Sequence, residues 1–389
     1  MKRFCCIFLF FTLLYAFTIP CVCAEAPNGA PQTETAFSGN IDAKSAILME
    51  ASTGEVLYEK NADQALPPAS VTKVMTILLV LEAIDSGKIK LDDMVTVSDY
   101  ASTMGGSQVY LKAGETMSVS DMLKSVVVAS ANDAAVALAE HVAGSEASFV
   151  AMMNARAAEL GMANTTFKNT NGLDDEDVGH LTSARDIALM SREVLKHEKI
   201  FDYTTIWMDS IRDGAFGLTN TNRLVRFYRG CNGLKTGSTS KAGFCISATA
   251  QRDGMQLICV IMGSSTKDAR NALAASLLDF GFANYSFVSI PGGVTDALHV
   301  RGGVQDDCHT EYGAFSILLT RGADKNIETE YTLPESLAAP VKKGDLIGTI
   351  TYRSGDTVLG TVDITAAEDV ERISFFTLFL RMLDTMALG

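Results

Sequence analysis

The sequence has few of the residues that mark several common protein classes. It holds one tryptophan, eight prolines and five histidines in 389 residues, and it contains no Gly-x-Ser-x-Gly segment. Without that segment a conventional Ser-His-Asp hydrolase is disfavoured. Basic residues are outnumbered, since 32 Lys and Arg stand against 46 Asp and Glu, and the net charge is −14. An acidic chain lacks the electrostatic footprint of a nucleic-acid-binding protein, so no nucleic acid is expected as a partner.

The first residues have the pattern of an export signal. Lys2 and Arg3 precede an apolar run over residues 4–19, and the small residues of Val22-Cys23-Ala24 follow it. We predict a cleaved secretory signal over residues 1–24, a linker over 25–40 and an extracytoplasmic location. A membrane-spanning anchor that stays attached is the alternative. Cleavage removes two basic residues and no acidic one, leaving 30 against 46, or −16.

Half of the eight cysteines lie in this predicted signal. The other four are Cys231, Cys245, Cys259 and Cys308. None of these has the Cys-x-x-Cys spacing of a zinc site, so no metal is expected. If residues 253–254 form a two-residue turn between strands, Cys245 and Cys259 face opposite sides of the sheet and cannot pair.

Hydrophobic residues make up 47% of the chain, enough for a substantial core, and their spacing predicts its elements. A β-hairpin is predicted over residues 46–58, a buried helix over 71–84, helices over 118–160 and 182–195, strands over 233–237, 244–250 and 257–262, and a helix over 269–280. This order predicts an α/β domain over residues 41–288, with the two early strands at an edge of its sheet. Glycine turns and short strands then predict a small all-β domain over 289–365.

Three short segments carry residues suited to chemistry. Ser70-Val71-Thr72-Lys73 opens the apolar helix, and its three-residue step puts Ser70 and Lys73 on one face. A desolvated lysine can accept the serine proton, while N–H groups of the helix start can stabilise an oxyanion. In Ser130-Ala131-Asn132, a hydroxyl can relay a proton and an amide can hold a substrate carbonyl. The alternative is a helix-capping serine beside a structural asparagine.

The third segment is Lys235-Thr236-Gly237, on a predicted strand. Its lysine and threonine can bind a carboxylate, and its glycine lets a substrate backbone approach. The alternative is an exposed edge lysine beside a turn glycine. Together, in this order, the three segments match the motif set of penicillin-recognising serine enzymes.

The residues around these segments resemble those of the low-molecular-mass penicillin-binding proteins, the D-alanyl-D-alanine carboxypeptidases of serine peptidase family S11. The similarity covers roughly residues 40–285 and includes the stretches 68–76, 129–134, 233–237, 171–173, 180–188 and 241–244. Residues 290–365 also fit the second domain of these enzymes, with weaker motifs. The resemblance implies a β-lactamase/transpeptidase-like α/β fold, an antiparallel sheet with a helical region.

The resemblance also implies a set of roles for the matched residues. Ser70 would attack the carbonyl between the terminal D-alanines of a peptidoglycan stem peptide, with Lys73 as the general base, and Ser130 would protonate the leaving D-alanine. The expected substrate-binding residues are Asn132, Lys235, Thr236, Ser238 (through its N–H, with that of Ser70, in the oxyanion hole) and Arg270. For Arg270 a solvated position on the helix is the alternative. No cofactor is expected, β-lactams would be covalent inhibitors, and His180 is expected to be structural.

Other functions share this scaffold. A DD-transpeptidase or endopeptidase differs only in what takes the acyl group, and a β-lactamase carries the same three motifs. The β-lactamase is disfavoured because the region before the late strands has no Glu-x-x-x-Asn and the chain continues into a further domain. An inactive binding module is disfavoured by the intact Ser70 and Lys73.

The tail, residues 366–389, is predicted to form an amphipathic helix. Apolar residues dominate it, with a narrow polar stripe formed by Ser374, Thr377, Arg381 and Asp384. Its apolar run is too short to span a bilayer, so we expect it to lie in the membrane surface as an anchor. Acidic residues outnumber basic ones in the tail, so apolar burial would hold it there. A helix packed on the β domain is the alternative.

Overall fold

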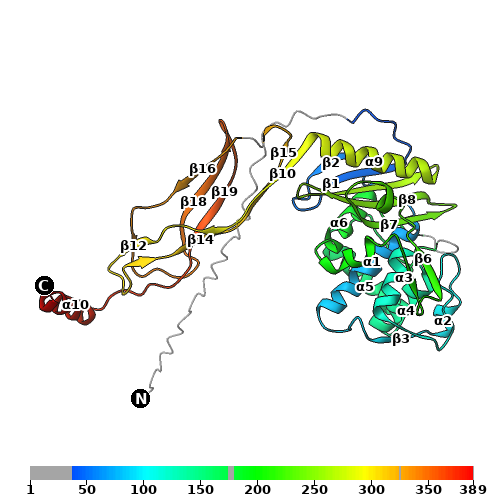
Figure 1. The fold of residues 1–389 in the computed structure, drawn as a ribbon, viewed down its shortest axis with the longest axis horizontal. Helices are drawn as coiled ribbons and strands as arrows, with labels where there is room; N and C mark the ends of the chain where they lie inside the picture. The colour runs from blue at the N-terminus through cyan, green and yellow to red at the C-terminus, as the bar shows by residue number, and fades with distance from the viewer. Residues whose placement is uncertain (1–36, 174–178, 324–325, 389) are drawn as a thin grey trace, which may run out of the picture.

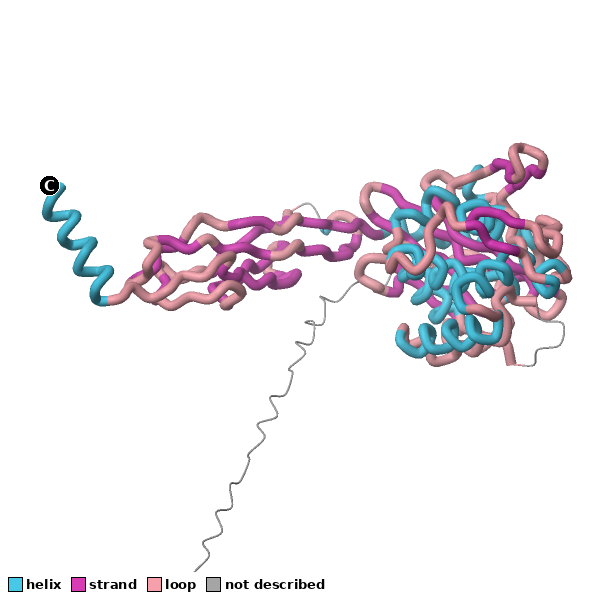
Figure 2. The backbone as a smooth tube through the Cα atoms, turned by 90° about the horizontal axis from the view of Figure 1, so that it is seen from below, coloured by secondary structure: helices cyan, strands magenta, loops and turns pink. Residues whose placement is uncertain are grey.

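The computed structural model of the chain describes residues 37–173, 179–323 and 326–388. They form a larger part that combines helices with a sheet, a slender β part, and a helix at the far end (Figure 1). Seen from a second side, the slender part continues the long axis of the molecule (Figure 2). The predicted signal and most of the predicted linker lie outside the described residues.

The larger part is built on a five-stranded antiparallel sheet with strand order β2-β1-β9-β8-β7. Its strands are β1 Ser45–Glu50, β2 Val56–Lys60, β7 Cys231–Thr239, β8 Gly243–Arg252 and β9 Met255–Ser264. As predicted, one sheet joins distant segments. The expectation that both early strands lie at an edge is wrong for β1, which pairs with β2 and with β9. All six residues of β1 are buried, and the apolar run over residues 46–49 suits a strand covered on both faces.

Strand β9 shows how the sheet separates two cores. Ile258 and Val260 pack into the core on the helical side, whereas Leu257 and Ile261 pack on the opposite side beneath α9. Arg252 pairs with Met255, so residues 253–254 form the predicted two-residue turn. The cysteines follow the same alternation. Cys245 and Cys259 pack in different cores and all four described cysteines are free, which confirms the prediction that these two cannot pair.

The helical region covers one face of the sheet, and α9 covers the other (Figure 1). The helices are η1 Ala69–Thr72, α1 Lys73–Asp85, α2 Asp99–Ser102, α3 Val119–Val128, α4 Asn132–Ala143, α5 Glu146–Glu159, α6 Ala184–Val194, η2 Glu198–Ile200, α7 Phe201–Thr204, α8 Leu224–Phe227 and α9 Lys267–Asn284. The short strands β3 Met94–Thr96 and β4 Thr116–Ser118 pair with each other, as do β5 Met208–Ile211 and β6 Phe216–Thr219.

Helix α1 is the predicted buried helix. Every residue from Val74 to Leu81 is buried, as expected for a helix that is apolar on all sides. It begins at Lys73, two residues later than the sequence predicts, because the preceding turn is the 3-10 helix η1. Ser70 therefore lies in the tighter turn that leads into the central helix.

The slender part consists of short strands, as predicted. They are β10 Tyr285–Ile290, β11 Gly293–Val294, β12 Leu298–Arg301, β13 Asp307–Cys308, β14 Thr310–Tyr312, β15 Phe315–Thr320, β16 Ile327–Thr332, β17 Leu337–Ala338, β18 Leu346–Ser354 and β19 Thr357–Ala366. They form sheets ordered β11-β14-β19-β18-β16, β13-β12-β17 and β10-β15. Tyr352 stacks on Phe315 in one of two small cores, with ring centroids 4.3 Å apart.

Helix α10 spans Phe375–Leu388, within the predicted range 366–389, but the prediction is wrong for residues 366–374, where Val370 and Arg372 form isolated bridges to Val341 and Gly303 of the β part. Its apolar side chains are exposed, including Phe375 at 85% and Met386 at 80%. None of the helices in the described residues is both long and apolar enough to span a membrane.

Candidate active site

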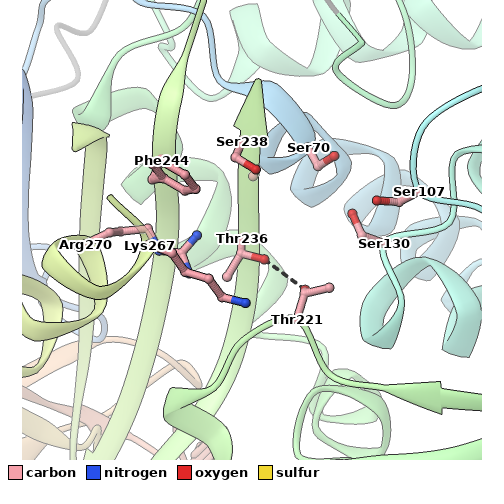
Figure 3. A pocket seen from close by; sticks show the side chains of 10 residues that line it. Ser70, Ser107, Ser130, Thr221, Thr236, Ser238, Phe244, Lys267 and Arg270 are labelled. Carbon is pink, nitrogen blue, oxygen red and sulfur yellow. Dashed lines mark hydrogen bonds between the residues drawn. The ribbon is translucent and has the colours of Figure 1, made fainter. Parts of the chain in front are cut away.

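A cleft of about 160 Å³ opens where the helical region meets the edge strand β7. Its lining residues come from η1, the α2–β4 loop, the α3–α4 connection, the β6–α8 loop, β7, β8 and α9 (Figure 3). They are Ser70, Ser107, Ser130, Thr221, Thr236, Gly237, Ser238, Phe244, Lys267 and Arg270. Members of all three sequence motifs therefore meet in one cleft.

Ser70 lies in a turn that the neighbouring strand holds closely. We call residues 68–72 the Ser70 turn. Ala69 has φ = +49°, a left-handed conformation that is costly for a residue with a Cβ. Gly237 of β7 passes so close that a Cβ there would lie 2.7 Å from the Ser70 nitrogen and 2.9 Å from that of Val71. The sequence suggests that residue 237 is glycine so that a substrate backbone can approach the strand. In the structure, the close approach of the Ser70 turn already requires glycine at this position.

Lys73 is completely buried behind Ser70, and its amine has three oxygen partners. Its Nζ lies 3.1 Å from Ser70 Oγ, 2.6 Å from Asn132 Oδ1 and 2.7 Å from the Asn171 carbonyl oxygen. Burial, reinforced by the charge of Lys235 and opposed by Asp133, holds the pKa of Lys73 well below its usual value. A neutral Lys73 has two N–H donors and one lone pair. When the two carbonyl oxygens take the N–H groups, the lone pair is left for the Ser70 hydroxyl.

Ser130 stands in the α3–α4 connection with a left-handed backbone, φ = +64°. Its side chain points into the cleft on the same side as Ser107 (Figure 3). Helix α4 has Ala131, not Ser130, as its N-cap residue, so the alternative of a capping serine is wrong. Within the described part of the chain, the buried Ser130 Oγ has no hydrogen-bond partner. A buried hydroxyl that lines a cleft and has no partner there is free to bind an incoming group.

Asn132 is buried behind the cleft, at 2% exposure. Its Oδ1 accepts a hydrogen bond from Lys73, and its Nδ2 donates to the Gly105 carbonyl oxygen over 2.7 Å. Its backbone N–H donates to Ser107, which lines the cleft. In this structure the Asn132 side chain connects Lys73 to the Gly105 carbonyl oxygen, and its expected contact with substrate stays a prediction.

Thr236 lies on the side of the cleft opposite Ser130, whereas its neighbour Lys235 is buried and is not among the lining residues (Figure 3). Lys235 is 1% exposed and donates from Nζ to the Thr236 carbonyl oxygen over 2.9 Å. Burial, together with the nearby charge of Arg270, lowers the pKa of Lys235 to about 7. The alternative of an exposed edge lysine is therefore wrong. Thr236 Oγ1 donates to Thr221 Oγ1 over 2.9 Å and faces the cleft (Figure 3).

Arg270 is 2% exposed and lines the cleft, so the alternative of a solvated helix residue is wrong. Its guanidinium is held by Asn271 Oδ1, 2.8 Å from Nη2, and by the Cys245 carbonyl oxygen, 3.2 Å from Nη1. Burial lowers its pKa to about 10. One turn earlier on α9, the exposed Lys267 reaches into the same cleft (Figure 3).

The lining residues include two cationic side chains and no carboxylate, in a chain whose net charge is −14. The cleft is therefore suited to a small anionic group beside Ser70. The motifs did not reveal the lining residues Ser107, Thr221, Phe244 and Lys267. Lys267 carried a usable signal, since it precedes Arg270 by one helical turn. In the described part of the chain, no three His, Cys, Asp or Glu side chains gather in a way that could hold a metal ion.

Comparison with known proteins gives two family matches. A model described as D-alanyl-D-alanine carboxypeptidase, Peptidase S11, matches residues 30–266, and one described as the C-terminal domain of penicillin-binding protein 5 matches 300–372. The chain is similar to the D-alanyl-D-alanine carboxypeptidase DacF of Bacillus subtilis, with 43% identity over 88% of this chain and 89% of that one.

Two solved structures share the fold. Penicillin-binding protein 5 of Haemophilus influenzae has a TM-score of 0.73 and 30% identity, covering 87% of this chain and 100% of that one. Penicillin-binding protein D2 of Listeria monocytogenes, solved with ampicillin bound, has a TM-score of 0.57 and 33% identity, covering 62% of this chain and 98% of that one.

Proposed function

The chain belongs to the Peptidase S11 family of D-alanyl-D-alanine carboxypeptidases, and we propose that it removes the terminal D-alanine of peptidoglycan stem pentapeptides through an acyl-enzyme on Ser70. The observation that carries this proposal is the set of three oxygen partners around the buried Lys73 amine. That arrangement leaves a neutral Lys73 one lone pair, directed to the Ser70 hydroxyl, which is what a general base requires.

Acylation forms one bond and breaks another. The Ser70 proton passes to Lys73 Nζ as Ser70 Oγ bonds to the carbonyl carbon between the two D-alanines. The C–N bond then breaks, and the proton held by Lys73 passes to the departing amine through Ser130, whose hydroxyl is unpartnered and faces the cleft, so that Lys73 is neutral again. N–H groups of Ser70 and Ser238 would stabilise the oxyanion. Water then cleaves the Ser70 ester, and Ser70 regains its proton.

The cationic side of the cleft would bind the substrate's terminal carboxylate. Thr236 and Arg270 line it, and Lys235 lies directly behind Thr236. A carboxylate raises the pKa of a neighbouring lysine, so substrate binding would favour the charged form of Lys235. This selects peptides with a free C-terminus. β-Lactams present a carboxylate and a reactive carbonyl in a similar arrangement, and we propose that they acylate Ser70.

Labelling by a fluorescent penicillin tests the nucleophile. We expect the label on the wild type and none on Ser70→Ala, while Ser107→Ala, a second cleft serine, keeps it. Persistent labelling of Ser70→Ala would overturn the assignment. Release of D-alanine from a D-Ala-D-Ala pentapeptide, followed by mass spectrometry with and without an acceptor amine, separates a carboxypeptidase from a transpeptidase. Rapid penicillin turnover without a stable adduct would instead indicate a β-lactamase.

We also propose that the protein acts outside the cytoplasmic membrane and rests on it through α10. The exposed apolar side chains of α10 support a helix lying in the membrane surface more than one packed on the β part. Arg381 of α10 makes polar contacts with the β part, which include an ion pair with Asp306 over 3.3 Å and a hydrogen bond to the Val304 carbonyl oxygen. Flotation of the protein with phosphatidylglycerol vesicles tests the proposal, and loss of binding is expected when residues 375–389 are removed.

A further inference from the structure

His180 lies behind the cleft and not among its lining residues. It is 4% exposed, and its ring packs edge-on against Phe167, with centroids 5.8 Å apart. Both ring nitrogens are engaged. The Lys168 backbone nitrogen lies 3.0 Å from Nδ1, and Thr72 Oγ1 lies 2.7 Å from Nε2. Each ring nitrogen of the buried His180 therefore has a hydrogen-bond partner of known type.

The partners determine the tautomer. A backbone N–H can only donate, so the Nδ1 atom that faces Lys168 must accept and carries no proton. The proton of the neutral ring is then on Nε2, which donates to Thr72 Oγ1. Thr72 in turn donates its hydroxyl proton to the Ala69 carbonyl oxygen over 2.9 Å. A continuous series of hydrogen bonds therefore connects Lys168, through His180 and Thr72, to Ala69, the residue immediately before Ser70.

The Ala69 carbonyl is the point at which the Ser70 turn is under strain. Ala69 is in the left-handed region, and Gly172 approaches so closely that a Cβ there would lie 1.9 Å from the Ala69 oxygen. A bond to that oxygen fixes the peptide that precedes the nucleophile. Thr72 supplies this bond, and His180 fixes the rotamer of Thr72.

The other partner of His180 begins the segment that holds the general base. Three residues after Lys168, the Asn171 carbonyl oxygen accepts from Lys73 Nζ over 2.7 Å. Between them, Thr170 donates to Glu146 and accepts a bond from Thr76 over 2.6 Å. His180 is therefore bonded both to the Ser70 turn and to the segment that positions the amine of Lys73.

We propose that His180, with its proton on Nε2, is a positioning residue that aligns Ser70 with Lys73 from behind the cleft. The link to Thr72 leads directly to the Ala69 carbonyl beside Ser70, whereas the segment of Lys168 is also held by Glu146 and Thr76, so the Thr72 link is the one that governs acylation. This inference rests on the proposed function, because it takes Ser70 as the nucleophile.

Two variants of His180 separate the links. Gln places an amide nitrogen near the Nε2 position and keeps the donor to Thr72, whereas Asn places an oxygen near Nδ1 and keeps only the acceptor for Lys168. We expect His180→Asn to lower the rate constant for acylation by a penicillin about tenfold or more, with little change in the dissociation constant of the initial complex. His180→Gln should stay within about threefold of wild type, because it retains the donor that acts on acylation.

Thr72 gives the matching test from the other side. Thr72→Val should lower the acylation rate as much as His180→Asn does, whereas Thr72→Ser, which keeps the hydroxyl, should be acylated near the wild-type rate. The Thr72→Val/His180→Asn double variant should be acylated no more slowly than Thr72→Val alone. Ser191→Ala is the control, since it removes a buried hydrogen bond, to the Ser247 hydroxyl, from residues that do not line the cleft, and it should lower thermal stability while leaving the acylation rate near wild type. Additive losses, or equal losses for the Asn and Gln variants, would overturn the inference.

Nitrogen NMR of the full chain is independent of these variants. A neutral imidazole with its proton on Nε2 is expected for His180 at pH 7.5, and a proton on Nδ1 would contradict the proposal. The outcomes also separate it from the proposed function. Labelling of Ser70→Ala would overturn the nucleophile, whereas equal His180 variants with an unlabelled Ser70→Ala would overturn the positioning role alone.

Discussion

Replacing Gly237 by alanine adds one methyl group where β7 passes the Ser70 turn. The new Cβ would lie 2.7 Å from the Ser70 nitrogen, 2.9 Å from the Val71 nitrogen and 3.0 Å from the Pro68 oxygen. All three are backbone atoms, so no side chain can rotate away to make room. Either the edge strand or the Ser70 turn has to move.

The distances give the size of the displacement. Ordinary contact between such atoms needs roughly 3.4 Å, so one side must move by about 0.5 Å or more. Because misplacement by about 1 Å can cost a hundredfold in rate, we expect Gly237→Ala to slow acylation by roughly 10- to 100-fold. The free energy of unfolding should fall by about 1–3 kcal/mol, as for other overpacked sites.

Stopped-flow acylation by a fluorescent penicillin measures this loss, with urea unfolding as the measure of stability. Gly217→Ala on β6 is the matched control, because a Cβ there meets no atom within 4 Å. It should leave both quantities near wild type. A Gly237→Ala protein that is acylated at the wild-type rate would refute the close approach of β7 to the Ser70 turn.

Three further outcomes are expected. The kcat/KM for D-alanine release should rise with pH while Lys73 loses its proton. It should fall again above about pH 7, because the charged form of Lys235 is populated only below the pKa of that group. A kcat/KM that rises steadily to pH 10 would contradict this. Arg270→Gln should raise KM about tenfold for a pentapeptide with a free C-terminus, because a charge-assisted hydrogen bond to the carboxylate is lost. The KM for the C-terminal amide of the same peptide should rise much less, and equal effects on both peptides would argue against carboxylate binding by Arg270. Removing residues 375–389 should abolish vesicle flotation without changing the hydrolysis of a soluble pentapeptide, and retained flotation would exclude α10 as the anchor.

Local patterns were enough to predict much of the fold. The apolar run behind Ser70 predicts the buried α1, and the turn at residues 253–254 places Cys245 and Cys259 on opposite faces. Both predictions depend on neighbours in the sequence, where periodicity is informative. The position of β1 between β2 and β9 was missed, because pairing with a strand more than 200 residues later leaves no local signal.

In the candidate site too, short motifs were informative, whereas contacts between distant segments left no signal in the sequence. The motifs predict that Ser70, Lys73 and Ser130 form one site. In the structure Ser70 and Ser130 line one cleft, and Lys73 lies buried behind Ser70 within hydrogen-bond distance of it. The bonds that hold Asn132 inside the protein, and the close approach that requires Gly237, follow from packing between distant segments and could not be predicted from the sequence. His180 appeared only as a structural residue because its partners, Thr72 and Lys168, are joined by the fold.

Locating the acyl group on the protein tests the central claim most directly. The purified enzyme would be mixed with a D-Ala-D-Ala pentapeptide, quenched in acid within milliseconds, digested and analysed by mass spectrometry. Acylation of Ser70 predicts a mass increase equal to the pentapeptide minus one D-alanine, on the peptide that contains Ser70 and nowhere else. D-alanine release without that adduct at any quench time, or an adduct on another residue, would contradict it.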